Sequence, residues 1–219
     1  MKIFIDTANI DHIREINSWG ILSGVTTNPS LCARERKEFH SLIKEIASIV
    51  KGPISAEACS MKKNEIVEEA RELAAIAENI VVKIPVTPEG LSATKTLSEK
   101  GVKVNMTLVF SANQALLAGH AGAAYVSPFI GRLDDIGHDG MGILYEIISV
   151  FENYEFDTEV IAASIRHPLH VVQAAQMGTD IATVPYEIIK AMVRHPLTDT
   201  GITRFLEDWD KVRGMSVKK

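Results

Sequence analysis

The chain has 219 residues, a length typical of one domain, and 46% of its residues are hydrophobic, which is enough for a sizeable core. Its 23 basic and 28 acidic side chains give a net charge of −5, which argues against nucleic acid or an anionic membrane as partner. The only cysteines, Cys32 and Cys59, form no CxxC motif, so neither a disulfide framework nor a structural zinc site is expected.

The sequence shows no recognisable signal for export or membrane insertion. Asp6 follows only three apolar residues, too early for the apolar core of a signal peptide. Residues 104–131 carry no Asp, Glu, Lys or Arg, but they include Asn105, Thr107 and Pro128. We therefore expect this stretch to be buried in a globular protein and not to span a membrane, and we expect a cytoplasmic location.

Short apolar runs bounded by Gly, Pro or Asn alternate along the whole chain with longer amphipathic segments. Most of the short runs contain β-branched residues, so they predict eight strands, at 2–7, 24–28, 54–59, 80–86, 103–109, 123–129, 159–165 and 181–185.

The segments between these runs predict helices. In residues 61–77, Ile66, Ala70 and Leu73 recur with helical spacing, and residues 140–151 and 168–177 behave similarly. Prolines 29, 88 and 168 lie where the first turn of a helix accepts proline.

Strands that alternate with helices pair in parallel, and eight such units predict a single (β/α)₈ barrel, the TIM-barrel fold. An open doubly wound sheet is the alternative, but GHDGMG at 137–142 has the wrong glycine order for its fingerprint and follows no strand. We expect one domain over residues 1–219, with 200–213 as an appended C-terminal helix. Phe205, Trp209 and Val212 share a face of this helix, which would pack on the barrel or on a neighbouring subunit.

Polar side chains lie at the ends of most predicted strands, where a barrel of this kind has its active site. Residues two apart on a strand point the same way, so these side chains can converge on one mouth. Each Ser or Thr taken alone is explained better as a cap or turn residue, but the whole set is not. The set comprises Asp6, Thr26, Asn28, Glu57, Lys83, Asn105, Thr107, Ser127, Ser164 and Arg166.

Lys83 is the most informative of these residues because it interrupts an apolar strand, Ile80–Val86. Removal from water favours the neutral amine, which can attack a carbonyl to form a Schiff base. The alternative is a lysine whose ammonium group reaches water at the strand end. The carboxylates of Glu57 and Asp6 can transfer the protons that this chemistry needs, or they can form an ion pair that keeps Lys83 charged.

Arg132, Ser164 and Arg166 follow the sixth and seventh strands, where barrels frequently bind phosphate. The alternative for Arg132 is a surface ion pair with Asp134 or Asp135. A metal site is not expected, because no predicted strand ends in histidine and no zinc motif is present.

Six segments, in this order, resemble the transaldolase family, in its small branch that also holds the fructose-6-phosphate aldolases. The resemblance runs from residue 1 to about 213 and rests on FIDTAN at 4–9, GVTTNPSL at 24–31, VVKIPVT at 81–87, NMTLVF at 105–110, YVSPFIGRLDD at 125–135 and ASIRHP at 163–168.

The resemblance implies a (β/α)₈ barrel with Lys83 as a Schiff-base lysine that acts on sugar phosphates without a cofactor. It implies Asp6 as an acid/base, and Glu57 and Thr107 as holders of a catalytic water. A pentameric ring, single or paired as a decamer, is also implied, with the C-terminal helix reaching a neighbour. The substrate-binding residues would be Thr26, Asn28, Asn105, Ser127, Phe129, Arg132, Ser164 and Arg166.

Two positions favour a transaldolase over a fructose-6-phosphate aldolase. The aldolases resemble this chain but carry Gln and Tyr where it has Glu57 and Phe129. A phenyl ring cannot donate a hydrogen bond, so a three-carbon enamine would wait for an aldehyde acceptor. A metal-dependent barrel lyase and a non-catalytic phosphate-binding or assembly protein are the remaining alternatives.

Overall fold

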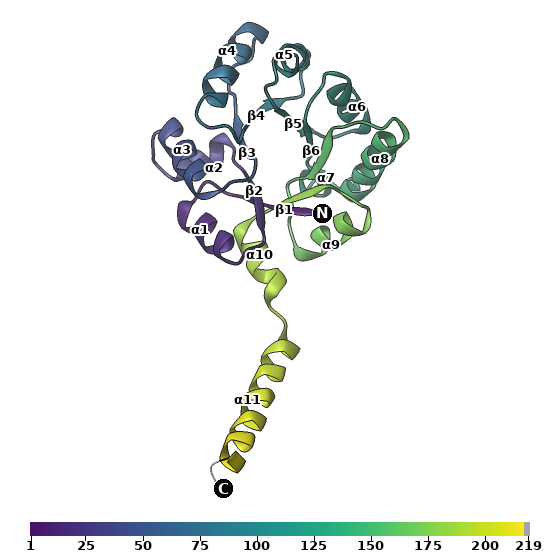
Figure 1. Ribbon diagram of the computed structural model, residues 1–219. Coiled ribbons are helices and arrows are strands. Elements are labelled where there is room, and N and C mark those ends of the chain that lie inside the picture. The colour runs from purple at the N-terminus through teal and green to yellow at the C-terminus, as the bar shows by residue number, and fades with distance from the viewer. Residues whose placement is uncertain (217–219) are drawn as a thin grey trace.

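Eight short segments rich in β-branched residues form a closed barrel of parallel strands in the computed structural model, which describes residues 1–216 (Figure 1). Each strand pairs with the next in sequence, and the eighth closes on the first. The predicted (β/α)₈ barrel is therefore confirmed. The strands are β1 (Lys2–Asp6), β2 (Leu22–Thr26), β3 (Ile54–Glu57), β4 (Ile80–Pro85), β5 (Val104–Val109), β6 (Tyr125–Pro128), β7 (Glu159–Ala162) and β8 (Ile181–Val184).

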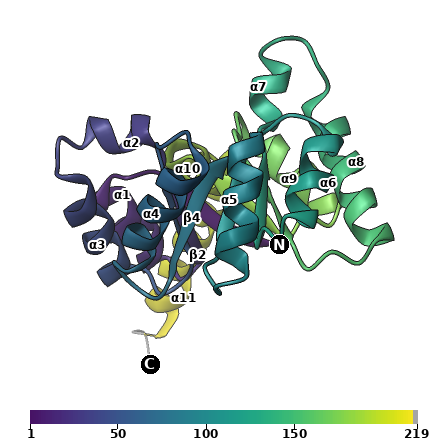
Figure 2. The same ribbon diagram turned by 90° about the horizontal axis from the view of Figure 1, so that it is seen from above.

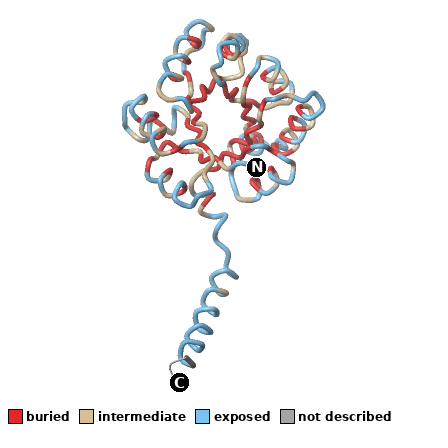
Figure 3. Tube along the Cα trace, in the orientation of Figure 1, coloured by how far each residue is buried: buried red, intermediate tan, exposed pale blue. Residues whose placement is uncertain are grey.

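Helices follow the strands and surround the barrel, with their apolar faces turned inward (Figures 1 and 3). Pro29, Pro88 and Pro168 lie in the first turns of their helices, as predicted. The helices are α1 (Ile10–Ser18), α2 (Pro29–Arg34), α3 (Phe39–Ile49), α4 (Lys63–Ala74), α5 (Pro88–Ser98), α6 (Ala112–His120), α7 (Ile130–Asp134), α8 (Gly140–Asn153), α9 (Pro168–Gln176), α10 (Tyr186–Val193) and α11 (Pro196–Ser216).

An apolar layer inside the barrel forms the floor beneath the polar layer at its mouth. Phe4, Val81 and Ile181 pack together in a buried cluster that also includes Tyr125 and Ile161. Because strand side chains alternate faces, each of these residues shares its face with the residue two positions on. Asp6, Lys83 and Thr183 are three of those residues, so the sequence pattern stacks polar groups directly above an apolar plug.

The predicted strands extend past the observed ones at most of their C-terminal ends. β2 ends at Thr26 and β7 at Ala162, so Asn28 and the pair Ser164 and Arg166 lie beyond the last ladder residue. Asn28 leaves the strand because its side-chain oxygen accepts a hydrogen bond from the Leu31 N–H and caps α2. The expectation that alternation along a strand aligns residue 164 with residue 166 is therefore wrong, and a turn positions them instead.

The C-terminal helix α11 projects away from the barrel (Figures 1 and 3). Phe205, Trp209 and Val212 are 75%, 56% and 50% exposed, so of the two expected contacts the one with the barrel does not form, and the one with a neighbouring subunit stays a prediction. The helix begins at Pro196, earlier than the predicted 200, because Pro196 fits a first turn. None of the helices within residues 1–216 combines the length and the hydrophobicity needed to cross a membrane.

Candidate active site

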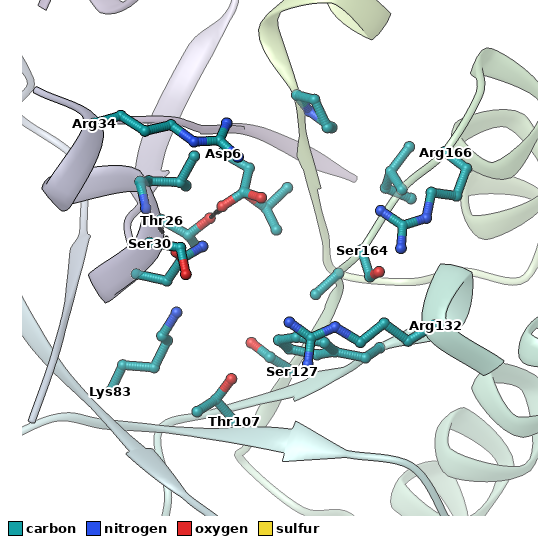
Figure 4. Close-up of a pocket in the computed structure, with 17 residues that line it drawn as sticks. Asp6, Thr26, Ser30, Arg34, Lys83, Thr107, Ser127, Arg132, Ser164 and Arg166 are labelled. Atoms are coloured by element: carbon teal, nitrogen blue, oxygen red, sulfur yellow. Dashed lines mark hydrogen bonds between the residues drawn. The ribbon is translucent and has the colours of Figure 1, made fainter. Parts of the chain in front are cut away.

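A cavity of about 280 Å³ opens at the end of the barrel where the strands finish (Figure 4). The short helices α2 and α7 rise on opposite sides of this end, as Figure 2 shows. Two of the predicted site residues, Glu57 and Asn105, do not line the cavity, and the others do. Those are Asp6, Thr26, Asn28, Lys83, Thr107, Ser127, Phe129, Arg132, Ser164 and Arg166.

Lys83 is buried at the cavity floor, with 5% of its surface exposed, so its ammonium group does not reach bulk water. Its Nζ lies 2.5 Å from the Thr27 carbonyl oxygen and 2.9 Å from Glu57 Oε2. The pairing of β3 with β4 sets Glu57 opposite Lys83 and so explains the contact. The ion pair considered as an alternative is therefore present. The lysine can attack a carbonyl only after its ammonium group loses a proton. Glu57 is positioned to accept that proton, because its carboxylate contacts Nζ.

Asp6 lies at the end of β1 on the same wall of the cavity as Thr26. Its Oδ1 accepts a hydrogen bond of 2.8 Å from the Thr26 hydroxyl, whose oxygen is 2.6 Å from Thr183 Oγ1. Burial raises the pKa of the Asp6 carboxyl above its usual range, and the positive charge of Lys83 and the hydrogen bond from Thr26 oppose this shift. A carboxylate with a raised pKa accepts a proton more readily, which suits an acid/base role.

Asn105 is fully buried behind the cavity wall, and its amide is already engaged by the protein. The side-chain amide donates to Ser55 Oγ at 3.1 Å, and its oxygen accepts a hydrogen bond of 2.8 Å from Ser127. Since Asn105 also lies opposite Lys83 in the register of β4 and β5, it fixes the position of Ser127 close to the lysine strand.

The Thr107 hydroxyl is buried and faces the cavity without a hydrogen-bond partner among the residues that the structure describes. Buried polar atoms almost always have a partner, so an isolated hydroxyl in a cavity wall points to a water or ligand that would complete it. Thr107 lies opposite Pro85, two residues beyond Lys83 on β4.

Two arginines lie together on the wall formed after β6 and β7 (Figure 4). The Arg132 guanidinium carbon lies 4.8 Å from the centre of the Phe129 ring, and Arg166 Nη2 lies 2.5 Å from Asp135 Oδ2. The alternative considered for Arg132, an ion pair with Asp134 or Asp135, does not form. Asp135 binds Arg166, because Gly131 allows α7 to pack directly against the turn that carries Arg166.

Sequence reasoning missed the contribution of α2 to the cavity. Ser30 and Arg34 line the wall that faces Arg132 and Arg166 (Figure 4). Their i, i+4 spacing after the Asn28 cap places them on one face of the helix, a signal the sequence does contain. The Arg34 guanidinium has no hydrogen-bond or ion-pair partner among the side chains and backbone that the structure describes. Thr183 on β8 also lines the cavity and was not predicted.

Over the described part of the chain, no three His, Cys, Asp or Glu side chains form a group that could hold a metal ion. The cavity can support proton transfer, because the buried amine of Lys83 contacts the Glu57 carboxylate and the Asp6 carboxyl lines the cavity beside a cationic wall.

The family model and the relatives that match this chain all indicate the same family. Residues 3–216 match the family model described as Transaldolase/Fructose-6-phosphate aldolase. A protein of Thermoanaerobacter sp. (strain X514) named probable transaldolase is 60% identical over 211 residues, which are 96% of this chain and 98% of the relative. A protein of Methanococcus maripaludis (strain C5 / ATCC BAA-1333) with the same name is 57% identical over 210 residues, again 96% and 98% of the two chains.

A solved structure of a thiamine phosphate pyrophosphorylase from Pyrococcus furiosus matches with a TM-score of 0.58 and 16% identity. The match covers 84% of this chain and 85% of that one. At this identity the likeness shows the shared fold alone.

Proposed function

The chain belongs to the transaldolase and fructose-6-phosphate aldolase family, and we propose that this enzyme transfers a dihydroxyacetone unit from a ketose phosphate to an aldose phosphate. The donor would be sedoheptulose 7-phosphate or fructose 6-phosphate, and the acceptor erythrose 4-phosphate or glyceraldehyde 3-phosphate, as in the pentose phosphate pathway. The observation that carries the proposal is the buried Lys83 at the floor of an arginine-lined cavity, in ion-pair contact with Glu57, which lies outside the cavity lining.

The first step in this proposal is formation of the Schiff base. A proton passes from the Lys83 ammonium group to Glu57, over a heavy-atom distance of 2.9 Å. The free amine then attacks the ketone carbon, and the carbinolamine loses its hydroxyl as water to leave a protonated imine. Glu57 supplies the proton that the departing hydroxyl needs, so the carboxyl ends the step ionised.

Cleavage then separates the sugar into two parts. Asp6 removes the proton from the hydroxyl on C4 of the ketose, the carbon that becomes the aldehyde of the leaving aldose phosphate. The electrons of the bond between C3 and C4 move into the imine to form an enamine on Lys83. The raised pKa of Asp6 favours this proton acceptance. The aldose phosphate leaves, a second aldose phosphate enters, and Asp6 returns the proton as the new carbon–carbon bond forms. A water held by Glu57 and the unpartnered Thr107 hydroxyl then hydrolyses the imine.

The arginine wall would hold the phosphate of both the donor and the acceptor. Guanidinium groups bind phosphate through charge-assisted, often bidentate hydrogen bonds. Arg132 makes only a ring contact with Phe129 among the described residues, so its N–H groups are available to an anion. Ser164 and Arg166 lie beside it on the same wall.

Phe129 supports transfer over simple aldol cleavage. Its ring contacts Phe110, at 5.8 Å between centroids, and also the Arg132 guanidinium. Phe129 therefore places an apolar surface in the cavity wall, at the position where a tyrosine hydroxyl could help to protonate the enamine. Without that proton source, the enamine persists until an aldehyde arrives. A fructose-6-phosphate aldolase that uses the same lysine is the second candidate.

The test is release of glyceraldehyde 3-phosphate from fructose 6-phosphate, measured with and without erythrose 4-phosphate. Release that depends on the acceptor supports a transaldolase. Equal release without the acceptor shows an aldolase and contradicts the argument from Glu57 and Phe129. Loss of turnover on exhaustive chelation would instead favour a metal-dependent lyase.

We also infer a homo-oligomer in which α11 contacts a neighbouring subunit, in a pentamer or decamer. Leu197, Phe205 and Trp209 are 74%, 75% and 56% exposed on α11, a large apolar area for one projecting helix. Light scattering on the whole chain tests this inference, with a chain that ends at residue 195 as the comparison. The two free cysteines suit a reducing compartment, which supports a cytoplasmic location.

A further inference from the structure

His170 is a buried histidine that lies behind the phosphate-binding wall and does not line the cavity. It belongs to the first turn of α9, and its ring lies between the two segments that carry Arg132 and Arg166. Those segments are α7 and the turn that precedes α9. The proposed mechanism gives His170 no role, although burial of an imidazole needs polar partners on both nitrogens.

Both ring nitrogens of His170 have such partners. Nδ1 accepts a hydrogen bond of 3.3 Å from the Arg166 backbone N–H, and Nε2 lies 3.0 Å from Asp134 Oδ2. An N–H donor faces Nδ1 and a carboxylate faces Nε2, so this network assigns the neutral tautomer with its proton on Nε2. The other Asp134 oxygen accepts a hydrogen bond of 2.9 Å from the Gly140 N–H, which anchors that carboxylate to the start of α8.

The two arginine-bearing segments are also in direct backbone contact. The Ile130 N–H donates to the Ala163 carbonyl at 3.1 Å. A Cβ at Gly131 would lie 2.0 Å from the Ser164 carbonyl oxygen, so only glycine permits this approach. His170 is the side-chain link between the same segments, and Asp135 adds a second link by holding the Arg166 guanidinium.

We propose that His170 is a positioning residue: its neutral ring joins Asp134 on α7 to the backbone of Arg166 and so sets the spacing of the two arginines that would bind the substrate phosphate. This inference rests on the proposed function of that wall. Asp134 then fixes the main chain of Arg166 through His170, while Asp135 fixes its side chain. The affinity for phosphorylated substrates depends on this spacing, whereas the reaction at Lys83 does not.

The bridge also depends on pH, because a protonated Nδ1 can no longer accept the Arg166 N–H. Burial lowers the pKa of His170, and the charges of His167 and Arg166 lower it further, while Asp134 raises it. The His167 ring faces it from the N-cap position of α9, at 3.8 Å between centroids. Asp134 faces it from α7, and Arg166 from the turn that precedes α9. The bridge is therefore intact at neutral pH and breaks as the solution becomes acidic.

The experiment compares three variants of the whole chain. His170→Leu removes both hydrogen bonds, and His170→Asn keeps an acceptor that can reach the Arg166 N–H. Val171→Ala is the matched control, because Val171 is the next residue, equally buried and apolar. Three quantities are measured: kcat and KM for fructose 6-phosphate with saturating erythrose 4-phosphate, the Kd of inorganic phosphate by calorimetry, and borohydride trapping of dihydroxyacetone on Lys83. Dihydroxyacetone carries no phosphate, so its trapping reports on the lysine alone.

For His170→Leu we expect KM and the phosphate Kd to rise together by about tenfold, with kcat and dihydroxyacetone trapping nearly unchanged. His170→Asn should recover part of the affinity and should show a weaker rise of KM with acidity than the wild-type protein. Val171→Ala should leave both affinities unchanged. If His170→Leu does not fold, His170→Asn against Val171→Ala decides the question.

Unchanged phosphate affinity in a folded His170 variant overturns the inference. A parallel fall of affinity, kcat and trapping, equal to that of Val171→Ala, also overturns it, because this pattern shows a merely structural role. Failure of the proposed function looks different. The wild-type protein would then neither turn over fructose 6-phosphate nor trap dihydroxyacetone, and the phosphate Kd would still test His170.

Discussion

Replacing Glu57 by Gln separates the two roles that the structure gives this residue. The amide keeps the shape of the side chain and one oxygen that can accept a hydrogen bond from Lys83 Nζ, now 2.9 Å from the carboxylate. It removes the negative charge and the ability to take a proton. The Lys83 ammonium group would then be buried with the Thr27 carbonyl as its remaining strong acceptor.

The effect on stability follows from the burial of the pair. Removing one member of a buried ion pair costs about 3–5 kcal/mol, and the retained amide oxygen reduces the cost here to about 1–3 kcal/mol. The effect on catalysis follows from loss of the proton acceptor. General acid–base catalysis contributes typically 10²- to 10⁴-fold, so kcat should fall by about that factor.

The assay for Glu57→Gln pairs urea unfolding with single-turnover trapping of fructose 6-phosphate by borohydride. Glu65→Gln is the control, because Glu65 and Lys62 form an exposed pair at 3.9 Å whose loss should cost well under about 1 kcal/mol. If Glu57→Gln forms the trapped adduct within about tenfold of the wild-type rate, Glu57 is not the proton acceptor for Lys83 and the proposed first step is refuted.

Three further predictions concern the cavity walls. Thr107→Val should change the free energy of unfolding by less than about 1 kcal/mol, because its hydroxyl has no partner to lose, but it should slow hydrolysis of the imine on Lys83. An unchanged rate of product release in pre-steady-state measurements would exclude the water-holding role. The free energy of unfolding should fall as pH drops below about 6.5, because the lowered pKa of His170 in the folded protein means that the unfolded chain binds more protons than the folded one. Urea unfolding at several pH values should show a smaller dependence of this free energy on pH for His170→Asn than for the wild-type protein. Arg34→Gln should raise KM for fructose 6-phosphate about fivefold, because an unpartnered cation in the cavity attracts an anionic substrate. Arg36→Gln, on the same exposed segment, is its control. Equal KM values for the two variants would show that Arg34 does not belong to the site.

The barrel and the floor of its cavity could be predicted because period-two alternation records which side chains face inward. Lys83 lies two residues after Val81, and Asp6 two residues after Phe4. A polar residue two positions after a buried apolar one on a strand therefore indicates a side chain that lines the cavity. The pattern also allowed an ion pair between Lys83 and Glu57, but only the register of β3 and β4 shows that it forms.

Residues beyond the strand ends could not be placed by alternation, because turns and caps position them. Ser164 has a φ of +60°, a left-handed conformation rare outside glycine, which turns the chain so that Ser164 and Arg166 both reach the cavity. Arg34 was missed because its place depends on the angle at which α2 leaves its Asn28 cap. The direction of α11 could not be predicted for a different reason. Its apolar face predicts a contact, but periodicity does not identify the surface that it contacts.

The most direct test of the account is to incubate the protein with fructose 6-phosphate, reduce with borohydride and map the modified peptide by mass spectrometry. The account predicts an adduct on Lys83, of the whole sugar phosphate or of its three-carbon unit, and none in the folded Lys83→Arg variant, which should also lose turnover. An adduct on another lysine, or near-normal turnover by Lys83→Arg, would contradict the Schiff-base mechanism.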